Sequence, residues 1–217
     1  VISGKPYVNF PENLKADANI ICKWHHFYDC RFIDSLREKS GAPVFYWAWD
    51  YFGPAAPEWH IKMINAADRY LGNDVFDRTV YPPELIPSQK LYYFPFDAAE
   101  KQFDKVDLPK EYGVVFFGSY FEKGDRAEWL GKLNKNIPVK IFSWNHEEWV
   151  KRGFDAEPAK YGEDFAIAVA KSRIILQFSV NDHTWGYWSN RVGKILMLGG
   201  FLLARYAPGM ELFLKDG

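Results

Sequence analysis

The sequence predicts an α/β protein built of two Rossmann-like, doubly wound parallel-sheet domains. Short apolar runs alternate with amphipathic segments along the whole chain, which is the pattern of parallel strands joined by crossover helices. A polar, weakly periodic segment at 97–109 separates the two halves and reads as a linker. We therefore expect an N-terminal domain over residues 1–100 and a C-terminal domain over residues 101–217. Both are expected to be incomplete at the ends of the chain.

The first half of the chain contributes strands and helices in alternation. Apolar and aromatic runs predict strands at 19–23, 43–49, 69–72 and 90–96. Helical periodicity predicts one helix at 29–39, with Phe32, Ile33 and Leu36 on one face, and a second at 58–67.

The second half repeats this alternation more clearly. Strands are predicted at 112–117, 139–142, 173–178 and 201–204. Helices are predicted at 125–133, 147–151, 161–171 and 189–198, and Asp125 is the expected N-cap of the first of these. The chain contains no internal repeat that would indicate a solenoid.

Composition narrows the class of protein. The net charge of −1 argues against a nucleic-acid surface built on bulk charge, so a nucleic-acid partner is not expected. The 18% aromatic content fits both a packed core and ring stacking on sugars or bases, and alone it decides neither. Cys22 and Cys30 match no zinc spacing and are expected to be reduced. With no apolar run of about 18–20 residues, we expect a cytoplasmic protein without a membrane span.

Several catalytic motifs are absent from the sequence. The chain has no phosphate loop of the Gly-x-x-x-x-Gly-Lys type, no Gly-x-Gly-x-x-Gly turn and no Gly-x-Ser-x-Gly elbow. It also lacks the Asp-x-Asp clamp of metal-dependent sugar transferases. The nearest approach is Asp155-Ala156-Glu157, which we expect to be solvated charge in a loop before Pro158. No metal site is predicted.

Small, polar and aromatic residues follow four strands of the predicted C-terminal sheet. Doubly wound sheets bind ligands beyond the carboxyl ends of their strands, so these segments are expected to form one pocket. They are Gly118-Ser119-Tyr120, Ser143-Trp144-Asn145-His146, Ser179–Asn190 and Tyr206–Glu211.

The segment before the 189–198 helix is the most specific of these signals. Ser189 and Asn190 can cap the helix and leave its first N–H groups facing an anion, and Arg191 can add a charge-assisted bond to a phosphate. The bland alternative is that Arg191 is a solvated helix residue. Gly118-Ser119 lets the backbone approach a ligand closely, but such a pair is also common in ordinary turns.

Candidate bases lie mostly in the first half. Asp50 ends the strand PVFYWAWD and is placed for a general base or a turn cap, with even weight on the two roles. His25 and His26 point to opposite faces if they lie on a strand, so they do not share a metal. His146 and His183 lie on strand-end loops, where ligand contact is the less favoured role.

The second half resembles a known family. The runs GEDFAIAVAKSRIILQFSVN and GYWSNRVGKILMLGGFLLARYAPGMELF resemble the C-terminal domain of GT-B-fold glycosyltransferases, most closely the spore-maturation (CgeB-like) group. VVFFGSYFEKGDRAEWL resembles the opening strand, glycine turn and helix of that domain. GAPVFYWAWDYF and ADRYLGND resemble the back part of the partner N-terminal domain more loosely.

The resemblance implies transfer of a sugar from a nucleotide-sugar donor to a glycan, protein or small-molecule acceptor, without a bound metal or resident cofactor. By position, Gly118 and Ser119 would face the donor phosphates. Asn190 and Arg191 would hold the diphosphate at the helix start, and Glu211 is a weaker match. Asp50 or His25 would be the acceptor's base if the reaction inverts the anomeric centre.

One position departs from the family pattern. Lys194 stands where these families commonly have a glutamate that binds the donor ribose, and a lysine cannot accept hydrogen bonds from hydroxyls. Either the donor is held differently, or Lys194 contacts phosphate, or transfer activity is lost. The alternative function is therefore a non-catalytic nucleotide- or glycan-binding protein with the same fold. A third reading, a transferase acting on DNA bases, is disfavoured by the near-neutral charge.

Overall fold

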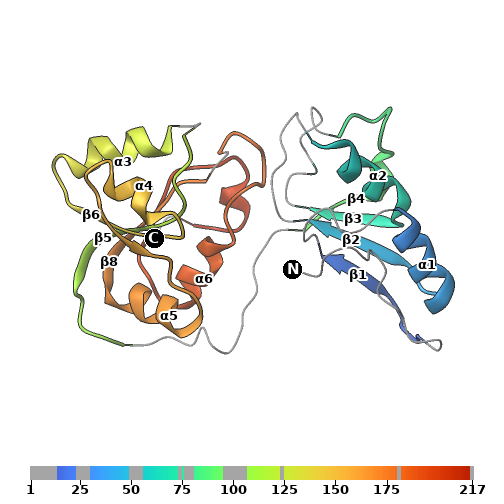
Figure 1. Ribbon diagram of the computed structural model, residues 1–217, viewed down its shortest axis with the longest axis horizontal. Coiled ribbons are helices and arrows are strands. Elements are labelled where there is room, and N and C mark those ends of the chain that lie inside the picture. Colours follow the sequence, from blue (N-terminus) through green and yellow to red (C-terminus); the bar gives the residue numbers. More distant parts are fainter. Residues whose placement is uncertain are drawn as a thin grey trace. The chain divides into compact units, whose positions relative to one another are not determined.

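The computed structural model describes residues 14–22, 30–48, 56–72, 75, 81–94, 107–122, 125–179 and 182–215. The chain divides into two compact units (Figure 1). Unit 1 comprises Val1–Pro95 with Thr184–Gly186, and unit 2 comprises Phe96–His183 with Tyr187–Gly217. Each unit is an α/β structure around a parallel sheet, as the alternating pattern predicts. His25, His26, Asp50 and most of the predicted linker lie outside the described residues.

Unit 1 has a four-stranded parallel sheet in the order β1-β2-β3-β4. The strands are β1 (Asn19–Cys22), β2 (Val44–Ala48), β3 (Arg69–Gly72) and β4 (Leu91–Tyr93). β4 begins at Leu91 and not at Lys90, because Lys90 is the last residue of a 3-10 turn, η2 (Ser88–Lys90), and it ends at Tyr93.

Two helices cover one face of this sheet. Helix α1 (Cys30–Ser40) buries Phe32, Ile33 and Leu36, the predicted apolar face, and α2 (Glu58–Ala66) packs beside it in the same core (Figure 1). Within the described residues no helix covers the other face. The doubly wound arrangement is therefore seen in unit 2 rather than in the described part of unit 1.

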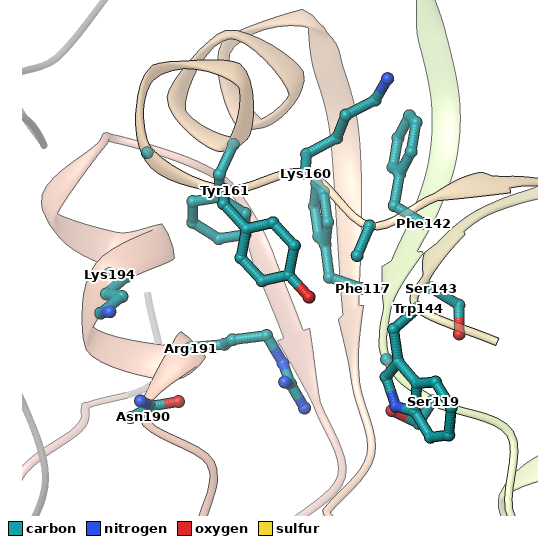
Figure 2. A pocket seen from close by; sticks show the side chains of 14 residues that line it. Phe117, Ser119, Phe142, Ser143, Trp144, Lys160, Tyr161, Asn190, Arg191 and Lys194 are labelled. Atoms are coloured by element: carbon teal, nitrogen blue, oxygen red, sulfur yellow. The ribbon is translucent and has the colours of Figure 1, made fainter. Parts of the chain in front are cut away.

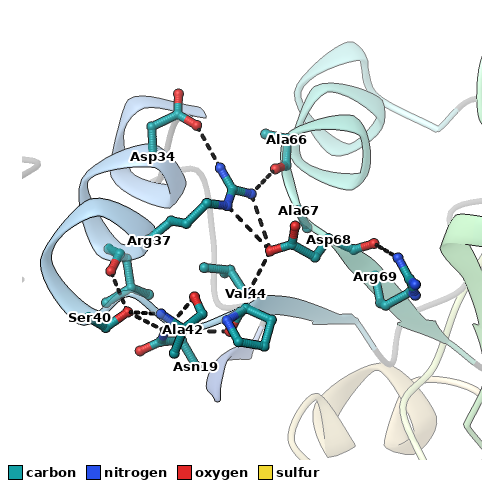
Figure 3. A network of polar contacts seen from close by, with 12 residues as sticks. Asn19, Asp34, Arg37, Ser40, Ala42, Val44, Ala66, Ala67, Asp68 and Arg69 are labelled. Carbon is teal, nitrogen blue, oxygen red and sulfur yellow. Dashed lines mark hydrogen bonds and ion pairs between the residues drawn. The ribbon is translucent and has the colours of Figure 1, made fainter. Parts of the chain in front are cut away.

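Arg37 fastens α1 to the start of the sheet (Figure 3). Its guanidinium contacts Asp68 Oδ2 through Nε at 3.3 Å and donates to the carbonyl of Ala66 at 2.7 Å. The same Asp68 oxygen accepts the N–H of Val44 at 2.8 Å. One carboxylate thus joins α1, the end of α2 and the first residue of β2 at the amino ends of the strands.

A hydrogen-bonded cluster lies in the core of unit 1. His60 Nδ1 lies 3.0 Å from Tyr46 Oη, and His60 Nε2 lies 3.2 Å from Tyr81 Oη. Tyr70 Oη is 3.1 Å from the same Tyr81 oxygen. All four side chains are buried, so their polar atoms depend on one another rather than on water.

Unit 2 has a five-stranded parallel sheet in the order β7-β6-β5-β8-β9. The strand order reverses between β5 and β8, which is the topological switch point where such sheets bind ligands. The strands are β5 (Tyr112–Phe117), β6 (Val139–Ser143), β7 (Asp155–Pro158), β8 (Ser172–Gln177) and β9 (Leu202–Ala204).

Helices cover both faces of this sheet (Figure 1). Successive residues of β5 alternate between two cores: Val115 and Phe117 pack on the side of α5 and α6, and Val114 and Phe116 on the side of α3 and α4. The helices are α3 (Arg126–Asn134), α4 (His146–Val150), α5 (Gly162–Lys171) and α6 (Arg191–Met197). The C-terminal half is thus doubly wound, as predicted.

Two local predictions were wrong. Residues 155–158 form strand β7 rather than a loop, because Asp155 and Glu157 lie on one face of the strand and both ion-pair with Lys140 of β6, at 2.6 and 2.7 Å. Asp125 precedes α3 but its side chain caps no N–H group of the helix. Its carboxylate is instead engaged by Arg205.

The turn after α6 shows why two glycines follow one another. Gly199 has φ of 71°, in the left-handed region that ends many helices. A Cβ on Gly200 would lie 2.8 Å from Ile195 and 2.9 Å from Val169, both buried. Backbone conformation thus demands the first glycine, and packing demands the second.

In the described part of the chain, no helix has the length and apolar character to cross a membrane.

The buried cluster of unit 1 predicts a stability effect. Tyr81→Phe removes a hydrogen-bond partner of both His60 and Tyr70 without changing the packing volume. We expect the free energy of unfolding of unit 1 to fall by about 1–3 kcal/mol, measured by hydrogen exchange of the β2 and β3 amides in the full chain. Tyr92→Phe, which removes an exposed hydroxyl bonded to Arg69, is the control and should change it by less than about 0.5 kcal/mol. Equal effects of the two changes would contradict the prediction.

Candidate functional site

A cavity of about 230 Å³ opens at the carboxyl ends of β5 and β6, beside the starts of α5 and α6 (Figure 2). Three of the four predicted strand-end segments contribute to it, and the 206–211 segment does not. The lining contains three basic side chains and no carboxylate. It consists of Phe117, Gly118, Ser119, Phe142, Ser143, Trp144, Ala159, Lys160, Tyr161, Gly162, Phe165, Asn190, Arg191 and Lys194.

The Gly118-Ser119 turn lines the cavity, and hydrogen bonds from neighbouring residues fix its position. The N–H of Gly118 donates to the carbonyl of Phe142 at 3.1 Å, and the Gly118 carbonyl accepts from the indole Nε1 of Trp149 at 3.2 Å. A Cβ on Gly118 would lie 2.5 Å from Cζ of Phe116, a fully buried ring. The core packing against the turn therefore requires a glycine at position 118, independently of any ligand.

Asn145 joins the turn after β5 to the turn after β6. Its side-chain amide donates to the carbonyl of Tyr120 and accepts the N–H of the same residue, both at 2.9 Å. Ser143 Oγ donates to the same amide oxygen at 2.7 Å. The asparagine thus continues the strand pairing past the end of the sheet. The position of Asn145 after a strand was predicted from the sequence, but its role in joining the two turns was not.

Arg191 is the first residue of α6 and extends into the cavity toward the side lined by Tyr161 (Figure 2). Its N–H donates to Ser189 Oγ at 3.3 Å, whereas Asn190 makes no side-chain cap. Its Nε is buried and has no hydrogen-bond partner among the described residues. Burial lowers the pKa of the guanidinium, and Tyr187 and Tyr161 oppose that shift. These observations argue against the alternative interpretation of Arg191 as a solvated helix residue.

Arg126, the first residue of α3, is a buried arginine close enough to Arg191 for their charges to interact, although it is not among the residues that line the cavity. It is 7% exposed and donates to the carbonyls of Ser119 at 3.1 Å and Phe178 at 2.7 Å. Its Nε, like that of Arg191, is buried without a partner in the described residues. Burial lowers its pKa to about 10, and the charge of Arg191 acts in the same direction.

Arg126 was not among the site residues predicted from the sequence. One signal could have found it: a cation in the first turn of a helix opposes the helix dipole, so its place after a glycine turn calls for another reason. The two arginines stand on either side of the switch point, since α3 follows β5 and α6 follows β8. Neither forms an ion pair with a carboxylate in the described part of the chain.

The structure brings together five of the predicted donor-binding residues: Gly118, Ser119, Asn190, Arg191 and Lys194 all line the cavity. Glu211 lies apart, in the 3-10 turn η4 (Met210–Leu212). Its carboxylate accepts from Tyr206 Oη at 3.1 Å and from the N–H of Gly209 at 3.0 Å. A donor contact from Glu211 stays a prediction. So do the catalytic roles of Asp50 and His25, which lie outside the described residues.

The remaining histidines and acids do not assemble a metal site in the described residues. His146 begins α4 with Nδ1 buried and unpartnered, and His183 is largely exposed beside Asp182. Among the residues that the structure describes, no three His, Cys, Asp or Glu side chains gather in a way that could hold a metal ion.

Comparisons with known proteins show a fold and no family. No family model matches the chain, and no curated protein matches it. Two crystal structures of Anabaena Alr3699/HepE are similar: the complex with UDP and glucose (TM-score 0.53, 11% identity) and the complex with UDP (TM-score 0.54, 9% identity). The matches cover 88% and 91% of this chain. The lipopolysaccharide outer core galactosyltransferase WaaB, in its apo form, gives a TM-score of 0.49 at 12% identity, with 86% of this chain and 57% of WaaB covered.

The chain spans 63% and 62% of the HepE chain in these two matches. At such low identities the likeness is one of fold. The α/β architecture with parallel sheets, predicted from the sequence, is thus shared with a protein whose crystals hold UDP and glucose.

The close packing of Gly118 against Phe116 predicts the effect of a substitution. Gly118→Ala places a methyl group against the buried Phe116 ring, and we expect the free energy of unfolding to fall by about 1–3 kcal/mol in urea. Gly131→Ala in α3 is the matched control, because a Cβ there meets nothing within 4 Å. It should leave stability unchanged or raise it by about 1 kcal/mol. The packing argument fails if Gly118→Ala is as stable as the wild type.

Proposed function

We propose that the chain is a GT-B-type glycosyltransferase that takes a sugar from a nucleotide-sugar donor, with the donor diphosphate held between Arg126 and Arg191. The observation that carries this proposal is a pair of arginines at the switch point of unit 2 whose Nε atoms are both buried, with neither arginine paired with a carboxylate of the described residues. Two neighbouring buried cations repel each other and lack solvation, so an anion between them relieves both penalties.

The chemistry of the cavity fits a diphosphate better than other anions of its size. Guanidinium groups bind phosphate oxygens through charge-assisted and often bidentate hydrogen bonds. Lys160 and Lys194 add positive charge to the lining. Trp144 and Tyr161 are 68% and 73% exposed at the cavity, and their rings offer stacking surfaces to a base or a sugar. A nucleoside diphosphate linked to a sugar supplies all of these groups.

The mechanism follows from the charges. As the bond between the anomeric carbon and the diphosphate breaks, negative charge grows on the leaving diphosphate. Arg126 and Arg191, fixed before the reaction in a partly dry site, stabilise that charge more than they stabilise the donor. We propose that these side chains serve in place of a metal ion and that no cofactor is resident. The base that activates a glycan, protein or small-molecule acceptor would be Asp50 or His25.

Likeness to HepE supports the donor class, because HepE shares the fold and is seen with UDP and glucose. The finer assignment to the CgeB-like group rests on the resemblance of the 112–217 region. A cytoplasmic location remains part of the same proposal.

Lys194 favours a second candidate function, a non-catalytic nucleotide- or glycan-binding protein. Its side chain lines the cavity, where an acidic residue would be needed to accept hydrogen bonds from the ribose hydroxyls. A lysine at this place keeps the attraction for phosphate and loses the contact that orients the ribose. Such a site binds a nucleotide diphosphate without arranging it for transfer.

Arg191→Ala tests the anion site directly. We expect the Kd for UDP, measured by calorimetry, to rise about 10- to 150-fold, because charge-assisted hydrogen bonds are worth about 1.5–3 kcal/mol. Lys151→Ala is the control, since the exposed Lys151 pairs with Glu148 on the surface of the same unit and should leave the Kd unchanged. Equal UDP affinity of Arg191→Ala and the wild type would sink the proposal.

A donor panel separates the two functions. We expect slow release of UDP, GDP or ADP from one of the corresponding nucleotide sugars, followed by coupled assay, and a rise in rate for Lys194→Glu if ribose orientation limits the wild type. Turnover by wild type establishes the transferase. Tight UDP binding with no turnover by either protein establishes the binding function instead.

A further inference from the structure

Arg205, the residue after β9, holds two aspartates whose charges act on Arg126. Its Nε is 2.6 Å from Asp182 Oδ2, and its Nη1 contacts Asp125 Oδ2. The Trp129 indole donates to the same Asp125 oxygen at 3.1 Å, and its ring lies 5.8 Å from the Arg205 guanidinium. The N–H of Arg205 donates to the carbonyl of Gln177, which fixes the arginine at the end of β8.

Both aspartates are within electrostatic reach of Arg126. Asp125 is its neighbour in sequence, and Asp182 follows β8, whose next residue, Phe178, accepts a hydrogen bond from Arg126. The charges of Asp125 and Asp182 both favour the protonated form of Arg126 and so raise its pKa, although burial outweighs them. Asp182 is only 9% exposed, so its carboxylate has little access to water and needs a cationic partner.

We propose that Arg205 is a positioning residue that binds Asp125 and Asp182 and thereby keeps both carboxylates off Arg126, so that the charge of Arg126 stays available to an anionic ligand. The inference rests on the proposed function, because it assigns a purpose to the lack of a carboxylate partner for Arg126 among the described residues. Arg205 engages one aspartate through Nε and the other through Nη1, a two-sided contact that the planar, forked guanidinium is suited to make.

Without Arg205, Asp182 would compete with the anionic ligand for Arg126. If Arg205 is removed, the nearly buried Asp182 retains its contact with the exposed His183, 3.4 Å away, and Arg126 becomes the buried cation with which it can form an ion pair. Such a pair is intramolecular, so it competes with ligand at an effective concentration in the millimolar range or above. A ligand that binds at micromolar concentration would then have to displace the aspartate before it could reach the arginine.

Calorimetric titration with UDP tests this, using Arg205→Gln, Asp182→Asn and the double variant. We expect Arg205→Gln to raise the Kd about tenfold or more, and the double variant to return it to within about threefold of wild type. Asp182→Asn alone should change the Kd by less than about threefold, because Arg205 already holds that carboxylate. A weakening that the second substitution does not relieve would show a merely structural role and overturn the proposal, as would unchanged binding by Arg205→Gln.

Charge and folding need separate controls. Lys151→Gln changes the charge of the same unit by the same amount and breaks the surface pair with Glu148, so an equal loss of UDP affinity there would overturn the proposal in favour of simple net charge. Should Arg205→Gln fail to fold, Arg205→Lys keeps the charge but not the fork. We expect it to weaken UDP binding and Asp182→Asn to relieve it; no relief would overturn the proposal.

The same titrations separate this proposal from the one on which it rests. Wild type that binds no UDP overturns both. Wild type that binds UDP, loses it with Arg191→Ala and keeps it with Arg205→Gln overturns the role of Arg205 alone.

Discussion

The site of unit 2 depends on the burial of Arg126 between the ends of two strands. Its guanidinium donates to the carbonyl of Ser119, after β5, and to that of Phe178, after β8, and so fixes the gap between the strands where the sheet order reverses. Phe116 packs beneath it, with its ring centroid 5.4 Å from the guanidinium. The same ring excludes any side chain at Gly118. Core packing, the glycine turn and the buried charge of Arg126 beside the cavity are therefore one arrangement, and we expect a change in any of them to disturb the others.

The fold was largely predictable from the sequence because its signals are local. The strand at 112–117 (YGVVFF) and the apolar helix face of Phe32, Ile33 and Leu36 were predicted correctly from local sequence alone. Strand β7 was not predicted, because its residues are polar and its stability comes from Lys140 on the neighbouring strand. The N-cap at Asp125 failed for the same reason: Arg205, eighty residues further along the chain, takes the carboxylate that would otherwise cap α3.

The candidate site was predictable in part. Gly118, Ser119, Asn190 and Arg191, which line the cavity, were predicted because they lie directly after a strand or at the start of a helix, where the topology alone points to a ligand. Lys194 was named because the resemblance to a known family puts a glutamate at its position. Asn145 and Arg126 were not assigned their roles, because each acts through backbone groups far away in sequence. Arg126 reaches Phe178 across 52 residues, and Asn145 reaches Tyr120 across 25. A single sequence contains no local pattern for such contacts.

Under the proposed function, the charges of unit 2 keep an anion site ready at the expense of stability. Arg126 and Arg191 have no carboxylate partner among the described residues, which destabilises the folded state, and the two aspartates whose charges act on Arg126 are held by Arg205. Pairing Asp182 with Arg126 would relieve that strain, yet Arg205 takes Asp182 instead. A protein selected only for stability would gain from the first pairing. The observed arrangement makes sense if an anionic ligand supplies the missing charge, because the destabilisation of the empty site then becomes part of the binding free energy.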